Sequence, residues 1–280
     1  MTAIFSSRVQ RWTLGILFAA ALPFSSSAAV IKVGSIPGAT SDAVQALIPE
    51  GKKQGLDIQL VEFTDWTLPN EAVNNRDIDV NFFQHEAFLN NAIKERGYDL
   101  ELIGLGLLQN IGLYSNKYQS LDQVPKGATV SLPNDPVNQG RGLLLLQKAG
   151  LITLRHGLDT GATVNDVVDN LKQLKLVEIE GPQLIHSLPD VDLAVVWPSY
   201  FVSAGRKADA GKALVYSGIA DTFYAMGFVT RKDRVNDPAL KQFVELFQQS
   251  QAVRNTIADR FDHNPHLYTL PWQGSSTASK

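Results

Sequence analysis

Short apolar runs alternate along the chain with segments whose apolar residues recur at helical spacing. In the first third the apolar runs cover 30–36, 56–63 and 78–83. Between them the spacing predicts a helix over 41–53 and a further helix that ends near Gly97. Strands separated by helices are typical of α/β proteins with parallel strands, because a helix is the usual crossover between two such strands.

Two later helices are predicted from Asp-Pro pairs. The pair at 135–136 begins a helix that runs to Gly150, and the pair at 237–238 begins another whose apolar face continues to Phe261. Aspartate caps the free N–H groups of a helix start, proline is tolerated at the first helical position, and glycine favours a helix end. We therefore expect a helix at each of these places.

The middle third is bracketed by two extended stretches at 100–113 and 213–229. Between them the pattern predicts a helix over 163–174 and strands near 176–179 and over 191–196. If both extended stretches cross between lobes, the chain forms two α/β lobes joined by two hinge strands. A cleft between lobes is a common place for a small-molecule site.

The first residues have the pattern of an export signal. Arg8 and Arg11 precede an apolar run over 12–22, and small residues follow up to Ala28. A basic start, a short apolar middle and a small-residue end are typical of a secretory signal, although a buried N-terminal helix is the alternative. We expect 1–28 to be removed, with cleavage near Ala28, and the protein to be periplasmic, with a flexible tail at 273–280.

Composition narrows the function classes. The 280 residues are 44% hydrophobic and 19% charged, with a net charge of −3 and no cysteine. Such a chain is too apolar to be disordered and has no basic bias for a nucleic acid. Without cysteine, disulfides, thiolate metal sites and a lipid-bearing cysteine are excluded within this sequence. Nucleophile and phosphate-loop motifs are missing and the histidines are scattered, so we expect a non-enzyme with no cofactor and no metal.

The stretch 61–88, VEFTDWTLPNEAVNNRDIDVNFFQHEAF, has an unusual mixture of residues. The aromatic side chains of Trp66, Phe83 and Phe88 are interleaved with polar ones, among them His85. Two interpretations are open. The rings pack at the end of a strand and the start of a helix, or they form an aromatic cage with a few directional polar groups, as in binding clefts.

A second candidate is 131–142, SLPNDPVNQGRG, where a strand ends and a helix begins. The start of a helix has free N–H groups and the positive end of the helix dipole. Arg141 lies in the second turn, and helical side chains lean toward the N-terminus, so its guanidinium reaches the same end. This arrangement suits a carboxylate, which arginine binds through two hydrogen bonds. The alternative is an exposed arginine paired with an acid.

Five ordered motifs resemble one known family. They are VEFTDW, PNEAV, IDVNFFQHEAFL, LYSNKYQSLDQVPKGATVSLPNDPVNQGRGLLLLQKAGLI and VDLAVVWPSYFVSAG. With them the chain resembles, over about 30–272, the methionine-binding proteins of bacterial ABC importers, the NlpA lipoprotein family.

The resemblance implies an α/β, two-lobed periplasmic-binding-protein fold of type II, in which two hinge strands join the lobes. Each lobe is then a mostly parallel sheet flanked by helices. We expect the first lobe to comprise 29–108 plus 228–272 and the second 109–227. The implied partners are a small-molecule ligand, an inner-membrane permease and its ATPase. We expect a monomer whose lobes close over the ligand.

The resemblance also implies the ligand-binding residues. Trp66, Phe83 and Phe88, with His85 beside them, correspond to the family's cage around the methionine side chain, and Arg141 corresponds to its carboxylate-binding arginine. An enzyme on the same scaffold is an alternative, which needs a titrating pair such as His85 with Asp65 or Glu86. A non-transport role, such as an adhesin or a sensor partner, is another.

Three departures from the family pattern bear on the ligand. Where the family has two asparagines that hold the amino acid's backbone groups, this chain has Trp197 and Met226. A buried ammonium without polar partners costs several kcal/mol, of which a cation–π contact with tryptophan returns about 0.5–2 kcal/mol. Methionine or a close analogue is therefore one expectation, and an amine-free or organosulfur carboxylate is the other. The third departure is the missing lipid-anchor cysteine.

Overall fold

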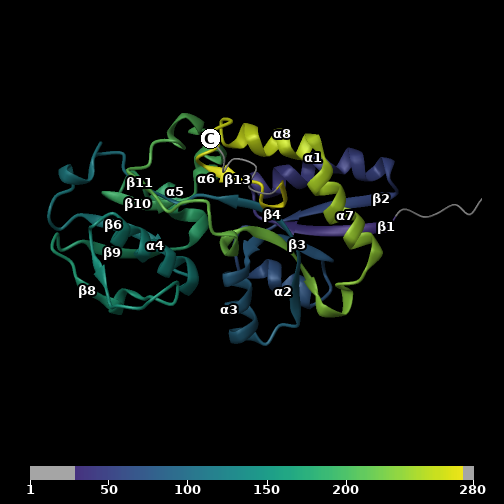
Figure 1. Cartoon of the computed structure of the whole chain (residues 1–280), viewed down its shortest axis with the longest axis horizontal. Helices are drawn as coiled ribbons and strands as arrows, with labels where there is room; N and C mark the ends of the chain where they lie inside the picture. The colour runs from purple at the N-terminus through teal and green to yellow at the C-terminus, as the bar shows by residue number, and fades with distance from the viewer. Residues whose placement is uncertain (1–28, 274–280) are drawn as a thin grey trace, which may run out of the picture.

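The computed structural model describes residues 29–273 as two α/β lobes that lie side by side (Figure 1). One lobe contains a six-stranded sheet and the other a five-stranded sheet. The predicted export signal and all of the predicted tail except Gln273 lie outside the described residues. Within 29–273 the helices are all too short or too polar to cross a membrane.

The six-stranded sheet begins as three parallel strands with intervening helices, as the pattern of the first third predicts. These elements are β1 (Ala29–Ser35), α1 (Ala39–Lys53), β2 (Leu56–Glu62), α2 (Leu68–Asn74), β3 (Val80–His85) and α3 (Glu86–Arg96). Gly97 ends α3 in the left-handed conformation (φ 70°), which a residue without a Cβ adopts at little cost.

The chain leaves this lobe and later returns to it along the strands that complete the same sheet. These are β4 (Leu100–Gln109), β12 (Met226–Arg231) and β13 (Tyr268–Thr269), in the order β13-β4-β12-β3-β1-β2. β12 is antiparallel to both β3 and β4, because the chain departs along β4 and returns along β12. The sheet is therefore mixed, with fewer parallel pairs than expected.

The five-stranded sheet repeats this plan in the order β11-β5-β10-β6-β9. In both sheets the second parallel strand lies outside the first, the third lies on its other side, and an antiparallel strand follows. The elements of this lobe are β5 (Gly112–Tyr114), β6 (Thr129–Pro133), α4 (Pro136–Lys148), β7 (Thr153–Leu154), β8 (Val167–Asp169), β9 (Lys175–Ile179), α5 (Leu184–Ser187), β10 (Leu193–Val196), α6 (Pro198–Ser203) and β11 (Val215–Tyr216).

The predicted helix over 163–174 is wrong. A 3₁₀ turn and strand β8 occupy this region, and Leu171 is 83% exposed, so its apolar residues form no buried stripe. Local side-chain bonds compete with the helix: Asp166 accepts from the N–H of Thr163, and the Asn170 side chain bonds both backbone groups of Leu174. Such bonds favour turns over helical hydrogen bonding.

The predicted single helix from 237 to Phe261 is two helices, α7 (Pro238–Gln249) and α8 (Gln251–Arg260). Ser250 separates them in an extended conformation, and its hydroxyl accepts a hydrogen bond from the N–H of Val253. This hydroxyl also bonds Glu50 of α1. The predicted apolar face is nevertheless buried across both helices: Leu240, Phe243, Val244, Phe247, Ile257 and Phe261.

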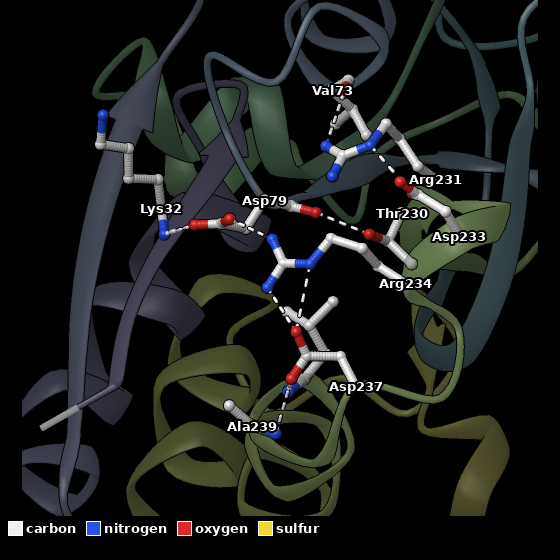
Figure 2. Close-up of polar contacts among 10 residues, drawn as sticks. Lys32, Val73, Asp79, Thr230, Arg231, Asp233, Arg234, Asp237 and Ala239 are labelled. Atoms are coloured by element: carbon white, nitrogen blue, oxygen red, sulfur yellow. Dashed lines mark hydrogen bonds and ion pairs between the residues drawn. The ribbon is translucent and has the colours of Figure 1, made fainter.

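An ion-pair network fastens the end of the first lobe (Figure 2). Arg234 pairs with Asp79, at the entry to β3, and with Asp237, which caps α7. Asp79 in turn accepts from the backbone N–H of Lys32 at 2.7 Å, and its carbonyl accepts from the hydroxyl of Thr230 at 2.7 Å. Arg234 and Asp79 together therefore join β1, β3, β12 and α7.

Candidate ligand-binding site

A cavity lies between the lobes, and together with the open solvent at its entrance it holds about 630 Å³ of space free of protein atoms. The cavity is lined by all seven residues singled out from the sequence: Trp66, Phe83, His85, Phe88, Arg141, Trp197 and Met226. The structure therefore brings together residues that are up to 160 positions apart in the chain.

The aromatic wall comes mainly from the first lobe. Phe83 and His85 are alternate residues of β3 and share one face of the strand, and Phe88 follows in the first turn of α3. The centroid of the Phe88 ring lies 5.8 Å from the centroid of Phe83 and 6.3 Å from that of Trp66, both in edge-to-face geometry. These contacts favour the cage interpretation over plain core packing, because the same rings border open volume.

Trp66 crosses from the first lobe to the second. Its ring lies 5.3 Å from the ring of Trp197, the residue that precedes α6, at an interplanar angle of 90°. Gly181 of the second lobe is so close that a Cβ there would lie 2.1 Å from the Trp66 ring. The two lobes therefore touch beside the cavity, and Trp197 lines it from the second lobe with 6% of its surface exposed.

Arg141 is buried in this cavity, not exposed and paired with an acid. Its side chain leans toward the start of α4, as expected, where Nη1 donates to Asn138 Oδ1 at 3.0 Å. The guanidinium carbon lies 4.4 Å from the centroid of the Tyr224 ring, and among residues 29–273 no carboxylate forms an ion pair with it. Burial lowers the pKa of Arg141 to about 10, so the group is still charged at neutral pH.

The start of α4 is less open to a ligand than the sequence suggested. Asp135 is the capping residue, and its Oδ1 accepts from the backbone N–H of Asn138 at 2.9 Å. This carboxylate uses an N–H group that was expected to be free. Burial raises the pKa of Asp135. A ligand anion therefore meets the guanidinium of Arg141, not an uncapped helix end.

His85 links the lobes through Asn138. The Nδ1 atom accepts from the backbone N–H of Phe88 at 3.2 Å, so the proton of the neutral ring is on Nε2, which donates to Asn138 Oδ1 at 3.1 Å. Burial, and then the charge of Arg141, lower the pKa of His85 from 6.5 to about 3. The ring is therefore neutral in this arrangement.

Among the described residues, His85 and Asp65, one of the two acid–base pairs considered from the sequence, do not bond each other. His85 bonds an amide and a backbone N–H, and Asp65 accepts from the N–H groups of Thr67 and Leu68 instead. The arrangement can bind an anion with an apolar body. It shows no activated nucleophile in the part of the chain that the structure describes.

Several lining residues were missed in the sequence: Gln109, Asn138, Tyr200 and Tyr224. Asn138 had a readable signal, because it precedes Arg141 by three residues and so lies on the same face of the helix. Gln109 had none, since it lies inside the extended stretch that the sequence predicts over 100–113. Its role at the cavity depends on where β4 ends relative to the other lobe.

Comparison with known proteins points in one direction. A family model described as NlpA lipoprotein matches residues 31–266. The D-methionine-binding lipoprotein MetQ of Escherichia coli O157:H7 is 43% identical over 224 residues, which cover 79% of this chain and 82% of that protein.

Solved structures agree with this match. A nutrient binding protein from Burkholderia cenocepacia, bound to methionine, is 36% identical with a TM-score of 0.77 and covers 83% of this chain and 97% of its own. The substrate binding protein of a methionine transporter from Streptococcus pneumoniae is 33% identical with a TM-score of 0.76. The match covers 83% of this chain and 93% of that protein. These likenesses confirm the predicted two-lobed fold of binding proteins.

Proposed function

Since the chain belongs to the NlpA lipoprotein family, we propose that it is the solute-binding protein of an ABC importer and that methionine is its ligand. The relatives that support this are binding proteins named for methionine or for a methionine transporter. The protein holds the ligand in the cavity between its lobes and delivers it to a membrane permease driven by an ATPase, without chemical turnover.

The observation that carries the proposal is the buried guanidinium of Arg141, which forms an ion pair with no carboxylate of residues 29–273, opposite an aromatic wall. A charge removed from water without a counter-ion is costly, and a bound carboxylate supplies that counter-ion. The rings of Phe83, Phe88 and Trp66 suit a thioether, because sulfur makes favourable contacts with aromatic edges. An apolar organic anion fits both features.

The identity of two cavity residues supports a second class of ligand. Trp197 and Met226 line the cavity at the positions where the family's ligand-holding asparagines were expected. Neither side chain accepts a strong hydrogen bond. An amine-free organosulfur carboxylate would need no such acceptor, so it is the alternative to methionine.

The test is calorimetry of the purified protein with both enantiomers of methionine. We expect saturable binding, and a loss of at least about 100-fold in Arg141→Met, which keeps an unbranched apolar stem but removes the charge. Arg155→Met is the matched control, because Arg155 is an exposed arginine of the same lobe and pairs with Asp166. If the unmodified protein binds neither enantiomer at millimolar concentration, methionine is not the ligand.

The location and the assembly belong to the same proposal. We propose an exported, periplasmic protein that works as a monomer without a lipid on a cysteine side chain, in agreement with the absence of cysteine from its 280 residues. The lobes, proposed as 29–108 plus 228–272 and 109–227, close as units about the crossings between β4 and β5 and between β11 and β12. Fractionation of the host cell and light scattering of the purified protein test the location and the monomer.

A further inference from the structure

Gln109 lies at the point where β4 leaves the six-stranded sheet, and it lines the cavity. Its Oε1 atom is buried and has no hydrogen-bond partner. Among the described residues two other buried side-chain atoms share this condition, on Asp135 and Trp272, and neither residue lines this cavity. A buried acceptor without a donor is unfavourable, so Gln109 needs an explanation.

Met226 determines how the amide of Gln109 is turned. The Nε2 atom of Gln109 lies 3.9 Å from the Met226 sulfur, within hydrogen-bond range for that element. A thioether sulfur is an acceptor only, so the NH₂ group must face it and the oxygen must face away. The residue that replaces an expected asparagine is therefore a positioning group for the neighbouring amide.

The other amide oxygens of the cavity are already engaged. Three side-chain amides line it: Gln84, Gln109 and Asn138. Gln84 Oε1 accepts from Asn70 at 2.9 Å, and Asn138 Oδ1 accepts from both His85 and Arg141. Of these three amide oxygens, only that of Gln109 is left to receive a donor from a ligand.

We propose that Gln109 Oε1 accepts a hydrogen bond from the ammonium group of the ligand, so that the site selects an α-amino acid over the amine-free acid of the same shape. The inference rests on the proposed binding function and deepens it. Arg141 neutralises the carboxylate and Gln109 receives the ammonium, so the two charged ends of an amino acid each have a partner. Gln109 thus takes over the task expected of an asparagine, with Met226 orienting it.

The experiment compares two probes that differ only in the amine: L-methionine and 4-(methylthio)butanoate. In the unmodified protein we expect methionine to bind more tightly. In Gln109→Met, which keeps the volume but has no oxygen, we expect methionine to lose affinity on the order of tenfold to a hundredfold. The affinity for the butanoate should change by no more than about twofold, because it never used that oxygen. Equal losses for both probes, or no loss for either, would overturn the proposal.

A second variant protects the test against a folding defect. Gln109→Glu keeps an acceptor and adds a negative charge beside the ammonium, so the preference for methionine over the butanoate should rise. A fall in that preference contradicts the proposal. The two hypotheses fail differently. A protein that binds methionine, but whose Gln109→Met variant loses affinity equally for both probes, is still a methionine carrier, and only the role of Gln109 is lost. One that binds neither probe overturns the proposed ligand as well.

Discussion

The bond between His85 and Asn138 predicts that ligand affinity depends on pH. In the closed arrangement burial and the charge of Arg141 hold the pKa of His85 near 3, against 6.5 for the ring in water. Protonation at Nδ1 would also place an N–H against the backbone N–H of Phe88, which that nitrogen accepts. When the lobes open, we expect the ring to meet water and regain its ordinary pKa.

The magnitude follows from the difference between the two states. Above about pH 7 the ring is neutral in both, so the affinity is constant. Below 6.5 the open form takes up a proton that closure must remove, and the penalty grows until pH falls to about 3. The apparent affinity falls by a factor of about 1 + 10^(6.5 − pH), which is roughly elevenfold, or about 1.4 kcal/mol, at pH 5.5.

Calorimetry with methionine from pH 8 to pH 5 at constant ionic strength measures this slope. His85→Gln retains groups that donate and accept but does not titrate, so its affinity should stay level over this range. The charged groups near the partners of the His85 ring are Arg141 and Asp135. Burial raises the pKa of Asp135, so protonation of this carboxyl at low pH favours the closed form, whereas protonation of His85 opposes it. Asp135→Asn should therefore keep the fall in affinity. Equal affinities at pH 7.5 and 5.5, or the same slope in His85→Gln, would refute the reasoning.

Three further predictions concern closure and stability. Gly181→Ala places a Cβ where the Trp66 ring lies, so we expect methionine affinity to fall about tenfold. Gly161→Ala, whose Cβ would make only an ordinary contact with Asp159 at 3.4 Å, should leave it unchanged, and equal affinity in both variants would contradict the contact. Arg234→Met breaks two ion pairs that are about three-quarters buried, so thermal unfolding should show a loss of stability of about 1–3 kcal/mol, with methionine affinity unaltered. Lys94→Met, at an exposed ion pair, should show no loss of stability. Ser250→Ala removes the cap between α7 and α8, for which denaturant unfolding should give a loss of about 1 kcal/mol; an unchanged midpoint would show that the cap is not needed.

Local signals were reliable where one residue type decides one piece of backbone. The Asp-Pro starts at 135 and 237 and the glycine end at Gly97 each lie where the pattern predicts them. The same logic failed at 163–174, where side-chain bonds to the backbone compete with helix formation, and at Ser250, whose hydroxyl can both end one helix and cap the next.

The chain by itself determined the kinds of residue that make the site. Rings at the end of β3 and an arginine one turn into α4 follow from strand and helix periodicity, which depends on neighbours within a few positions. Tertiary structure alone decided which of them meet. The bond from His85 to Asn138 and the contact of Trp66 with Gly181 depend on how two lobes meet, and the unpaired oxygen of Gln109 depends on how β4 lies beside Met226 of β12. Such contacts are made between distant parts of the chain, and no local periodicity encodes them, because packing of the whole fold sets their distances.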